Sequence, residues 1–198
     1  MPRFFVDKTN ITDNTARITG DDARHIARSL RMAVGDSVTV CDGEGQEYNA
    51  VLSRIRDEEC VCDIKEKTNS RCESPIRITL CMAYPKGDKL DSVIQKAVEC
   101  GASEITTFES ERCIVRAKGE NESKKVERRQ RIALEAAKQS GRGIVPTINP
   151  TISFSEMCRR AAEADIYENW TDVSGFMMAN PRIISKPAAI ETITYREL

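Results

Sequence analysis

Short apolar stretches separated by polar turns fill the first seventy residues of this 198-residue chain. The stretches are rich in β-branched residues, and turns such as Gly35-Asp36 and Asp42-Gly43-Glu44-Gly45 separate them, a pattern that is typical of short strands. The predicted strands include 37–40, 47–55 and 61–64. Together with one helix, this density of strands and turns predicts a compact β-barrel.

The predicted helix covers residues 21–32, and Asp21 and Asp22 are expected to cap its start. Two faces share this segment. One face is apolar and carries Ala23, Ile26, Ala27 and Leu30. The other carries Arg24, Arg28 and Arg31, whose guanidinium groups could each take a phosphate. The two aspartates partly neutralise this face, so a merely solvated surface is an equal alternative.

From residue 76 onward, strand patterns alternate with helix patterns, after a polar segment at 65–75 that reads as a linker. Strands are predicted at 76–83, 104–108 and 145–148. Helices are predicted around 90–98, closed by Gly101, from Ser123 to the stop at Gly141, and around 153–163. Repeated strand–helix–strand units predict a mostly parallel sheet.

Composition excludes several classes of protein. A hydrophobic share of 40% supports a folded core, and 30 basic against 31 acidic residues give a net charge of −1. No apolar run reaches the roughly 18 residues of a membrane helix, and the start lacks an export signal, so we expect a cytoplasmic protein without membrane contact.

Eight cysteines and one histidine, His25, bear on metal and nucleophile chemistry. No C-x-x-C pair occurs, so we expect no metal site and read the cysteines as reduced, small apolar side chains. The single histidine argues against a Ser-His-Asp or Cys-His system.

Positive charge concentrates in residues 112–142, which hold ten basic and four acidic residues. This segment can bind phosphates, or it can be a solvated helix face with pairs such as Glu127–Arg131. The turn at 84–89 lacks the spacing of a phosphate-binding loop, and no G-x-G-x-x-G follows a strand, which argues against a Rossmann nucleotide site.

Five segments in chain order resemble the bacterial 16S ribosomal RNA uridine-N3 methyltransferase family, and the likeness runs from residue 1 to about residue 165. They are MPRFFVD at 1–7, GDDARHIARSLRMAVGD at 20–36, YPKGDKLDSVIQKAVECGASEI at 84–105, SERC at 110–113 and EAAKQSGR at 135–142.

The resemblance implies an α+β two-domain protein. A PUA-like RNA-binding β-barrel would occupy 1–72, and an α/β SPOUT methyltransferase domain with a trefoil knot would occupy 73–198. It further implies a homodimer that uses S-adenosylmethionine to methylate N3 of one uridine in 16S ribosomal RNA of the small ribosomal subunit.

The same resemblance suggests site residues. Arg112 and Arg142 are expected near the reacting base as catalytic groups. Contacts with RNA are expected from Arg3, Arg24, Arg28, Arg31, Lys86 and Lys89. Solvated charge or surface pairing is an equal alternative for the lysines and for Arg112 and Arg142.

The sequence departs from the family pattern after residue 166, where a G-P-E-G-G-F loop and several tens of residues are missing. Here Asn180-Pro181-Arg182-Ile183-Ile184 resembles the family's G-x-R-I-L segment and is expected to form one wall of the cofactor pocket. Three interpretations remain: a sequence without its mobile knot loops, which we favour, a degenerate member, or an internal deletion.

A second function stays open beside the enzyme. Loss of the cofactor knot would leave a catalytically inactive RNA-binding member of the same family. A purely structural dimer or assembly factor is a weaker alternative, because the local excess of positive charge argues against it.

Overall fold

The computed structural model describes residues 1–111, 113 and 122–168 of the chain. Met1–Met157 form one compact unit, which contains both sheets, and a second unit begins at Cys158. The predicted boundary between 1–72 and 73–198 therefore stays a prediction.

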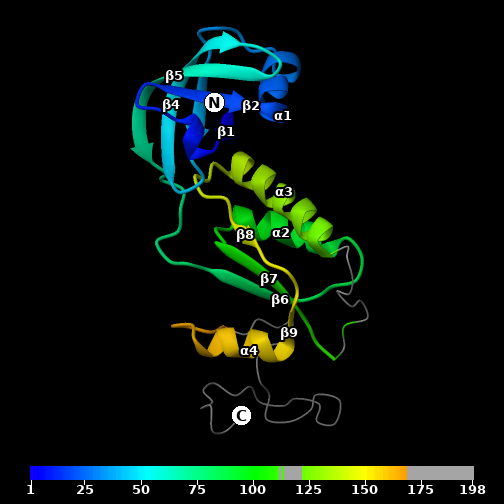
Figure 1. Ribbon diagram of the computed structural model, residues 1–198. Coiled ribbons are helices and arrows are strands. Elements are labelled where there is room, and N and C mark those ends of the chain that lie inside the picture. The colour runs from blue at the N-terminus through cyan, green and yellow to red at the C-terminus, as the bar shows by residue number, and fades with distance from the viewer. Residues whose placement is uncertain (112, 114–121, 169–198) are drawn as a thin grey trace, which may run out of the picture. The chain divides into compact units, whose positions relative to one another are not determined.

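The first sheet has five strands in the order β1-β3-β4-β5-β2, so β1 and β2 are its edges (Figure 1). β1 runs parallel to β3, and the other neighbours are antiparallel. The strands are β1 (Arg3–Phe5), β2 (Thr15–Thr19), β3 (Ser37–Cys41), β4 (Gln46–Ile55) and β5 (Glu59–Asn69). A 3₁₀ turn, Lys8–Asn10, follows β1.

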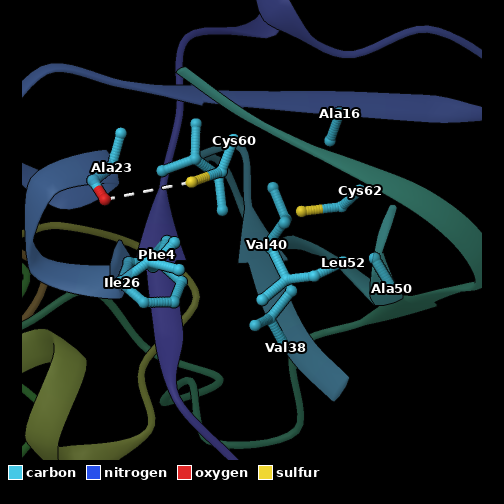
Figure 2. Packing of buried hydrophobic residues seen from close by; sticks show 11 residues of the cluster. Phe4, Ala16, Ala23, Ile26, Val38, Val40, Ala50, Leu52, Cys60 and Cys62 are labelled. Carbon is cyan, nitrogen blue, oxygen red and sulfur yellow. Dashed lines mark hydrogen bonds between the residues drawn. The ribbon is translucent and has the colours of Figure 1, made fainter. Parts of the chain in front are cut away.

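Buried apolar side chains alternate with more exposed ones along these strands, and the buried ones form the first core, which Figure 2 shows from close by. Side chains two residues apart point to the same face of a strand, and each strand from β2 to β5 buries two of them. These pairs are Ala16 and Ile18, Val38 and Val40, Ala50 and Leu52, and Cys60 and Cys62. Phe4, Ala23 and Ile26 complete the cluster. Each fully buried valine, leucine, isoleucine or phenylalanine of this cluster contributes about 1.5–3 kcal/mol.

The buried cysteines behave as the sequence predicts, as small apolar side chains. Burial raises the pKa of the Cys62 thiol to about 12, and it also raises the pKa of Cys60. Both thiols therefore stay protonated at neutral pH. Cys41 is the third buried thiol, whereas three other cysteines are exposed and depart from the prediction of buried side chains. The described residues contain no cluster of side chains that could hold a metal ion.

The helical segment between β2 and β3 differs from the prediction of one helix over 21–32. Its first part is α1 (Gly20–Arg24), whose N-cap is Thr19 and not an aspartate. The chain then forms a π-helical segment, His25–Ser29, in which the Leu30 N–H donates to the His25 carbonyl at 2.9 Å. Arg31 has a left-handed backbone with φ 51°. Ala23 and Ile26 are buried as predicted, whereas Leu30 is exposed.

The predicted linker at 65–75 is also shorter than expected. β5 continues to Asn69, because Gln46 to Asn49 of β4 pair with it through that point. The connection to the second sheet therefore begins at Ser70, and the next strand begins at Thr79 rather than at residue 76.

The second sheet is parallel, with the order β6-β7-β8 and with β9 also paired to β7 (Figure 1). Its strands are β6 (Thr79–Ala83), β7 (Glu104–Glu109), β8 (Thr147–Ile148) and β9 (Ile152–Ser153). The helices are α2 (Lys89–Glu99), α3 (Glu122–Ser140) and α4 (Phe154–Ala162).

Helices α2 and α3 share one core with this sheet. Leu90, Ile94 and Val98 lie at helical spacing on α2 and are buried against Ala133 and Ala137 of α3. Gly101 and Gly141 follow the two helices with φ 98° and 75°, a left-handed conformation that ends a helix at little cost for glycine. The predicted stops are therefore confirmed. None of the helices described is long and apolar enough to cross a membrane.

Candidate functional site

The carboxyl ends of the parallel strands meet at one edge of the second sheet, which is where sheets of this kind bind ligands. Tyr84 directly follows β6, and its N–H donates to the Phe108 carbonyl of β7 at 2.9 Å. Thr107 lies near the end of β7. Thr151 directly precedes β9, and because β9 pairs with the last two residues of β7, Thr151 lies at the level of Thr107. Three strands therefore deliver polar side chains to the same edge.

Helix α3 supplies two charged side chains to this edge. Glu122 and Arg129 are seven residues apart, which places them on one face of the helix, two turns from each other. Atoms Nη1 of Arg129 and Oε1 of Glu122 are 3.6 Å apart, an ion pair that is too long for a hydrogen bond.

Residues next to the strands form hydrogen bonds with each of these two charged side chains. The Arg129 Nη2 group donates to the Tyr84 hydroxyl, and the guanidinium carbon lies 5.1 Å from the centre of the Tyr84 ring. The Thr151 hydroxyl donates to Glu122 Oε1 at 2.9 Å, and the hydroxyls of Thr107 and Thr151 are 2.8 Å apart.

The remaining polar atoms of the pair have no hydrogen-bond partner among the described residues. These atoms are Glu122 Oε2 and Arg129 Nε and Nη1, and all three are buried. Only 4% of the Arg129 surface is exposed, so an incompletely bonded guanidinium at this depth is costly. Within the described part of the chain, this edge thus presents two guanidinium nitrogens and one carboxylate oxygen that make no hydrogen bond.

A basic rim of Lys86, Lys89 and Lys124 lies next to these residues in the chain. All three lysines are exposed, and none forms an ion pair with another described residue. Arg128, by contrast, binds Asp91 through two hydrogen bonds of 2.6 and 2.9 Å and so ties α3 to the start of α2. Lys86 and Lys89, both predicted from the sequence, are therefore free to meet an anion.

Arg142, predicted as a catalytic group, lies in the interior and is 2% exposed. Its guanidinium forms a 2.7 Å ion pair with Glu73 and donates to the carbonyls of Val98 and Ala102. These contacts give Arg142 a structural role. Its catalytic role stays a prediction that this geometry does not favour.

Glu73 also accepts hydrogen bonds from the backbone, in addition to those from Arg142. The backbone N–H groups of Gly143 and Ile144 donate to its Oε1 at 2.8 and 3.0 Å. Burial alone raises the pKa of Glu73, but these donors and Arg142 outweigh burial and hold the pKa below its usual value.

The arginines predicted to bind RNA are not brought together. Arg3 is half-buried, forms a 2.7 Å ion pair with Glu47, and donates to Cys41 Sγ at 3.0 Å. Arg24 and Arg28 are exposed and pair with Asp21 and Asp57. Because the π-helical segment and the left-handed Arg31 change the helical spacing, the predicted common face of Arg24, Arg28 and Arg31 is wrong as helix geometry. Their binding of RNA stays a prediction.

Two open, polar hollows lie on the first sheet. One of about 350 Å³ is lined by residues of β2, β4 and β5, including Arg17 and Arg54. The other, of about 300 Å³, is lined by residues that include Arg3, Glu47 and Arg71.

The remaining predicted residues lie outside the described part of the chain: Arg112 and the segment Asn180, Pro181, Arg182, Ile183 and Ile184. Tyr84, Glu122 and Arg129 were not singled out from the sequence as site residues. Glu122 and Arg129 entered the prediction only as charges of the basic segment 112–142, and the predicted helix began one residue after Glu122. The spacing of seven between Glu122 and Arg129 is the one local signal that could have found this pair.

Two family models match the chain. Residues 72–179 match the RNA methyltransferase domain, and residues 18–65 match the RNA methyltransferase PUA domain. Together with the two sheets, these matches confirm the predicted fold class, a PUA-like domain followed by an α/β SPOUT-type methyltransferase domain. The predicted knot falls outside the described residues.

Individual proteins show the same similarity. A Bacillus subtilis protein named ribosomal RNA small subunit methyltransferase E is 34% identical, over 83% of this chain and 66% of its own length. The crystal structure of a ribosomal RNA small subunit methyltransferase E from Neisseria gonorrhoeae, bound to S-adenosyl methionine, has a TM-score of 0.71 and 35% identity, over 79% of this chain and 64% of that one. A methyltransferase from Legionella pneumophila in complex with the same cofactor has a TM-score of 0.71 and 26% identity, over 80% and 66%.

The chain is shorter than these relatives. It spans between about half and two thirds of the length of the curated relatives that it matches, 66%, 51% and 65% for the first three.

Proposed function

This chain belongs to the RNA methyltransferase family in which a PUA domain precedes the methyltransferase domain, and on that premise we propose that it methylates N3 of a uridine in 16S ribosomal RNA. The observation that carries the proposal is the match of residues 72–179 to the methyltransferase domain, over the part of the chain that folds into the parallel sheet. The names of the relatives support the small-subunit RNA as substrate.

S-adenosylmethionine is the proposed methyl donor, since two similar structures carry it in their names. When bound, it supplies an electrophilic methyl carbon on a sulfonium. The parallel sheet has no Rossmann glycine loop after β6, which agrees with a cofactor site elsewhere in the chain. We assign one wall of that site to Asn180–Ile184 on the resemblance alone.

The RNA-binding surface is proposed to span both parts of the chain. The PUA-like domain, which we place at 1–72, carries hollows whose linings include arginines and glutamates. The methyltransferase domain, which we place at 73–198, carries the exposed Lys86 and Lys89 near the carboxyl ends of its strands. Arg112 stays proposed as a basic group near the target base. The resemblance also supports a homodimer that acts in the cytoplasm on the small ribosomal subunit.

Methylation of small ribosomal subunits tests the proposal. Purified protein, labelled S-adenosylmethionine and subunits from cells that lack the modification are incubated, and nucleosides are then analysed by mass spectrometry. We expect N3-methyluridine to approach one residue per RNA. The proposal fails if neither subunits nor naked 16S RNA gain N3-methyluridine at micromolar enzyme, while S-adenosylhomocysteine gives no heat in a calorimetric titration.

A further inference from the structure

We propose that Glu122 and Arg129 bind the imide edge of the target uracil, with Glu122 accepting the N3 proton and Arg129 donating to the adjacent carbonyl oxygen. The inference rests on the proposed function and deepens it, because it names the residues that recognise and activate the base. It starts from the three buried atoms of this pair that have no partner.

The pattern of free donors and acceptors fits uracil. The imide edge presents a carbonyl oxygen, an N–H and a second carbonyl oxygen side by side. Glu122 Oε2 is a free acceptor for the N–H, and Arg129 Nε and Nη1 are free donors for a neighbouring oxygen. The charges of the two side chains lie beside each other, with 3.6 Å between the nearest atoms, so one flat edge can meet both.

A phosphate and a cytosine fit less well. A phosphate would bind Arg129 but would be repelled by the Glu122 carboxylate. Cytosine presents an unprotonated N3 and an amino group in place of the N–H and the carbonyl, so it would place acceptor against acceptor and donor against donor. The pair therefore selects uracil over both.

The protein holds each side chain by the atoms that the base does not need. Thr151, in contact with Thr107, binds Oε1 of Glu122 and leaves Oε2 free. Tyr84 binds Nη2 of Arg129 and leaves Nε and Nη1 free. Tyr84 and Thr151 are thus positioning residues, and the free atoms are oriented before the base arrives.

The three free atoms are themselves buried, so a base must displace neighbouring groups to reach them. Glu122, whose side chain is 19% exposed, is the more accessible member of the pair, and we place the approach of the base on its side. Exposed Lys86 lies two residues beyond Tyr84 and is suited to a phosphate of the same RNA strand. A base that has left its stack would reach the pair while its backbone meets this lysine.

The chemical step balances with the proposed methyl donor. The N3–H proton passes to Glu122 Oε2, and the N3 electron pair forms the new bond to the methyl carbon as the carbon–sulfur bond breaks. Negative charge that develops on the uracil oxygen is stabilised by Arg129. The products are N3-methyluridine, neutral S-adenosylhomocysteine and protonated Glu122.

Nucleotide binding tests recognition without any turnover. Calorimetry on the wild-type chain with uridine, cytidine and N3-methyluridine 5′-monophosphates should show tightest binding for the uridine form. We expect the other two to bind at least about tenfold more weakly, because each leaves a buried group unpaired. Glu122→Gln should remove this preference, whereas Glu127→Gln, an exposed carboxylate on the same helix, should keep it. Equal binding of the three nucleotides, or no binding at about 10 mM, would overturn the inference.

Methylation kinetics test the proton transfer. Glu122→Gln should lower kcat by about 100-fold or more with little change in RNA affinity, and its rate should rise about tenfold per pH unit as the free imide ionises. RNA that contains 5-fluorouridine, whose N3–H is more acidic, should restore much of the rate. Arg129→Lys should lower kcat without this rescue.

The two proposals fail in different ways. An active wild type with a fully active Glu122→Gln variant would exclude this role for Glu122 and leave the methyltransferase function intact. An inactive wild type that still prefers uridine monophosphate would contradict the proposed function and retain the recognition site.

Discussion

At the scale of single residues, the ion pair of Glu73 and Arg142 shows how burial can decide a role. An arginine in a basic segment reads as a ligand for phosphate, but here its guanidinium lies 2.7 Å from a carboxylate and is almost fully buried. Removing one partner of a buried pair leaves an uncompensated charge, which is more costly than the pair itself is stabilising.

Glu73→Gln is therefore expected to lower the free energy of unfolding by about 3 kcal/mol, measured by urea denaturation at pH 7. Glu99→Gln, which removes an exposed carboxylate paired with Lys96, is the matched control, and its free energy of unfolding should stay close to that of the wild type.

The low pKa of Glu73 makes this stabilisation depend on pH. Its contribution is complete above the ordinary carboxyl pKa of about 4.3 and is lost as pH falls through the lower pKa of the folded state. The difference between the wild type and the variant should therefore shrink as pH falls below about 4.3. A constant difference would contradict this account.

At the scale of elements, the segment from Gly20 to Arg31 shows the limit of helical periodicity. A regular helix would align Arg24, Arg28 and Arg31, but the π-helical hydrogen bond from Leu30 to His25 spans five residues and adds one residue to the turn. Arg24 pairs locally with Asp21, Arg28 pairs with Asp57 twenty-nine residues away, and Arg31 leaves the helix with φ 51°.

Replacing Arg24, Arg28 and Arg31 by alanine tests whether this element binds RNA. We expect weaker binding to small-subunit RNA and a salt dependence whose slope falls by about one unit for each phosphate that the variant no longer binds. Arg31 lies outside the helix. The changes in RNA affinity caused by Arg31→Ala and by the Arg24→Ala/Arg28→Ala double variant should therefore be independent of each other. Arg131→Ala, on α3, serves as the control. An unchanged slope in the triple variant would mean that these arginines are merely solvated.

At the scale of the whole molecule, contacts join the two sheets within the unit Met1–Met157. Lys138 of α3 donates to both oxygens of Asp22 in α1 at 2.9 and 3.3 Å, and Ile144 forms β-bridges with Gly43 and Glu44. Phe5 of β1 packs against the core of the second sheet. The sheets are thus expected to unfold as one cooperative unit.

Native-state hydrogen exchange checks this cooperativity. Amides in the middle of β4 and of β7 should report the same opening free energy. Asp22→Asn should separate the two values by weakening the first sheet's attachment, while Asp21→Asn, next to it but paired only with exposed Arg24, should not. Two distinct opening free energies in the wild type would show that the sheets are independent.

Local patterns in the sequence determined much of this fold. The period of two in the strands, the helical spacing of Leu90, Ile94 and Val98, and the stops at Gly101 and Gly141 are properties of neighbouring residues. They suffice for a strand-rich first part and a parallel α/β second part. Five motifs in chain order also predicted the family, because proteins with similar sequences share a fold.

Tertiary structure decided the rest. The extension of β5 to Asn69 depends on its pairing with β4, and the burial of Arg142 depends on Glu73, sixty-nine residues away. Likewise, Tyr84 meets Arg129 across forty-five residues, and Thr151 meets Glu122 across twenty-nine. The sequence around a charged residue is the same whether its side chain is solvated, forms an ion pair, or is buried with unpaired polar atoms. Only the residues packed around it distinguish these states, because they determine its access to water and to a partner.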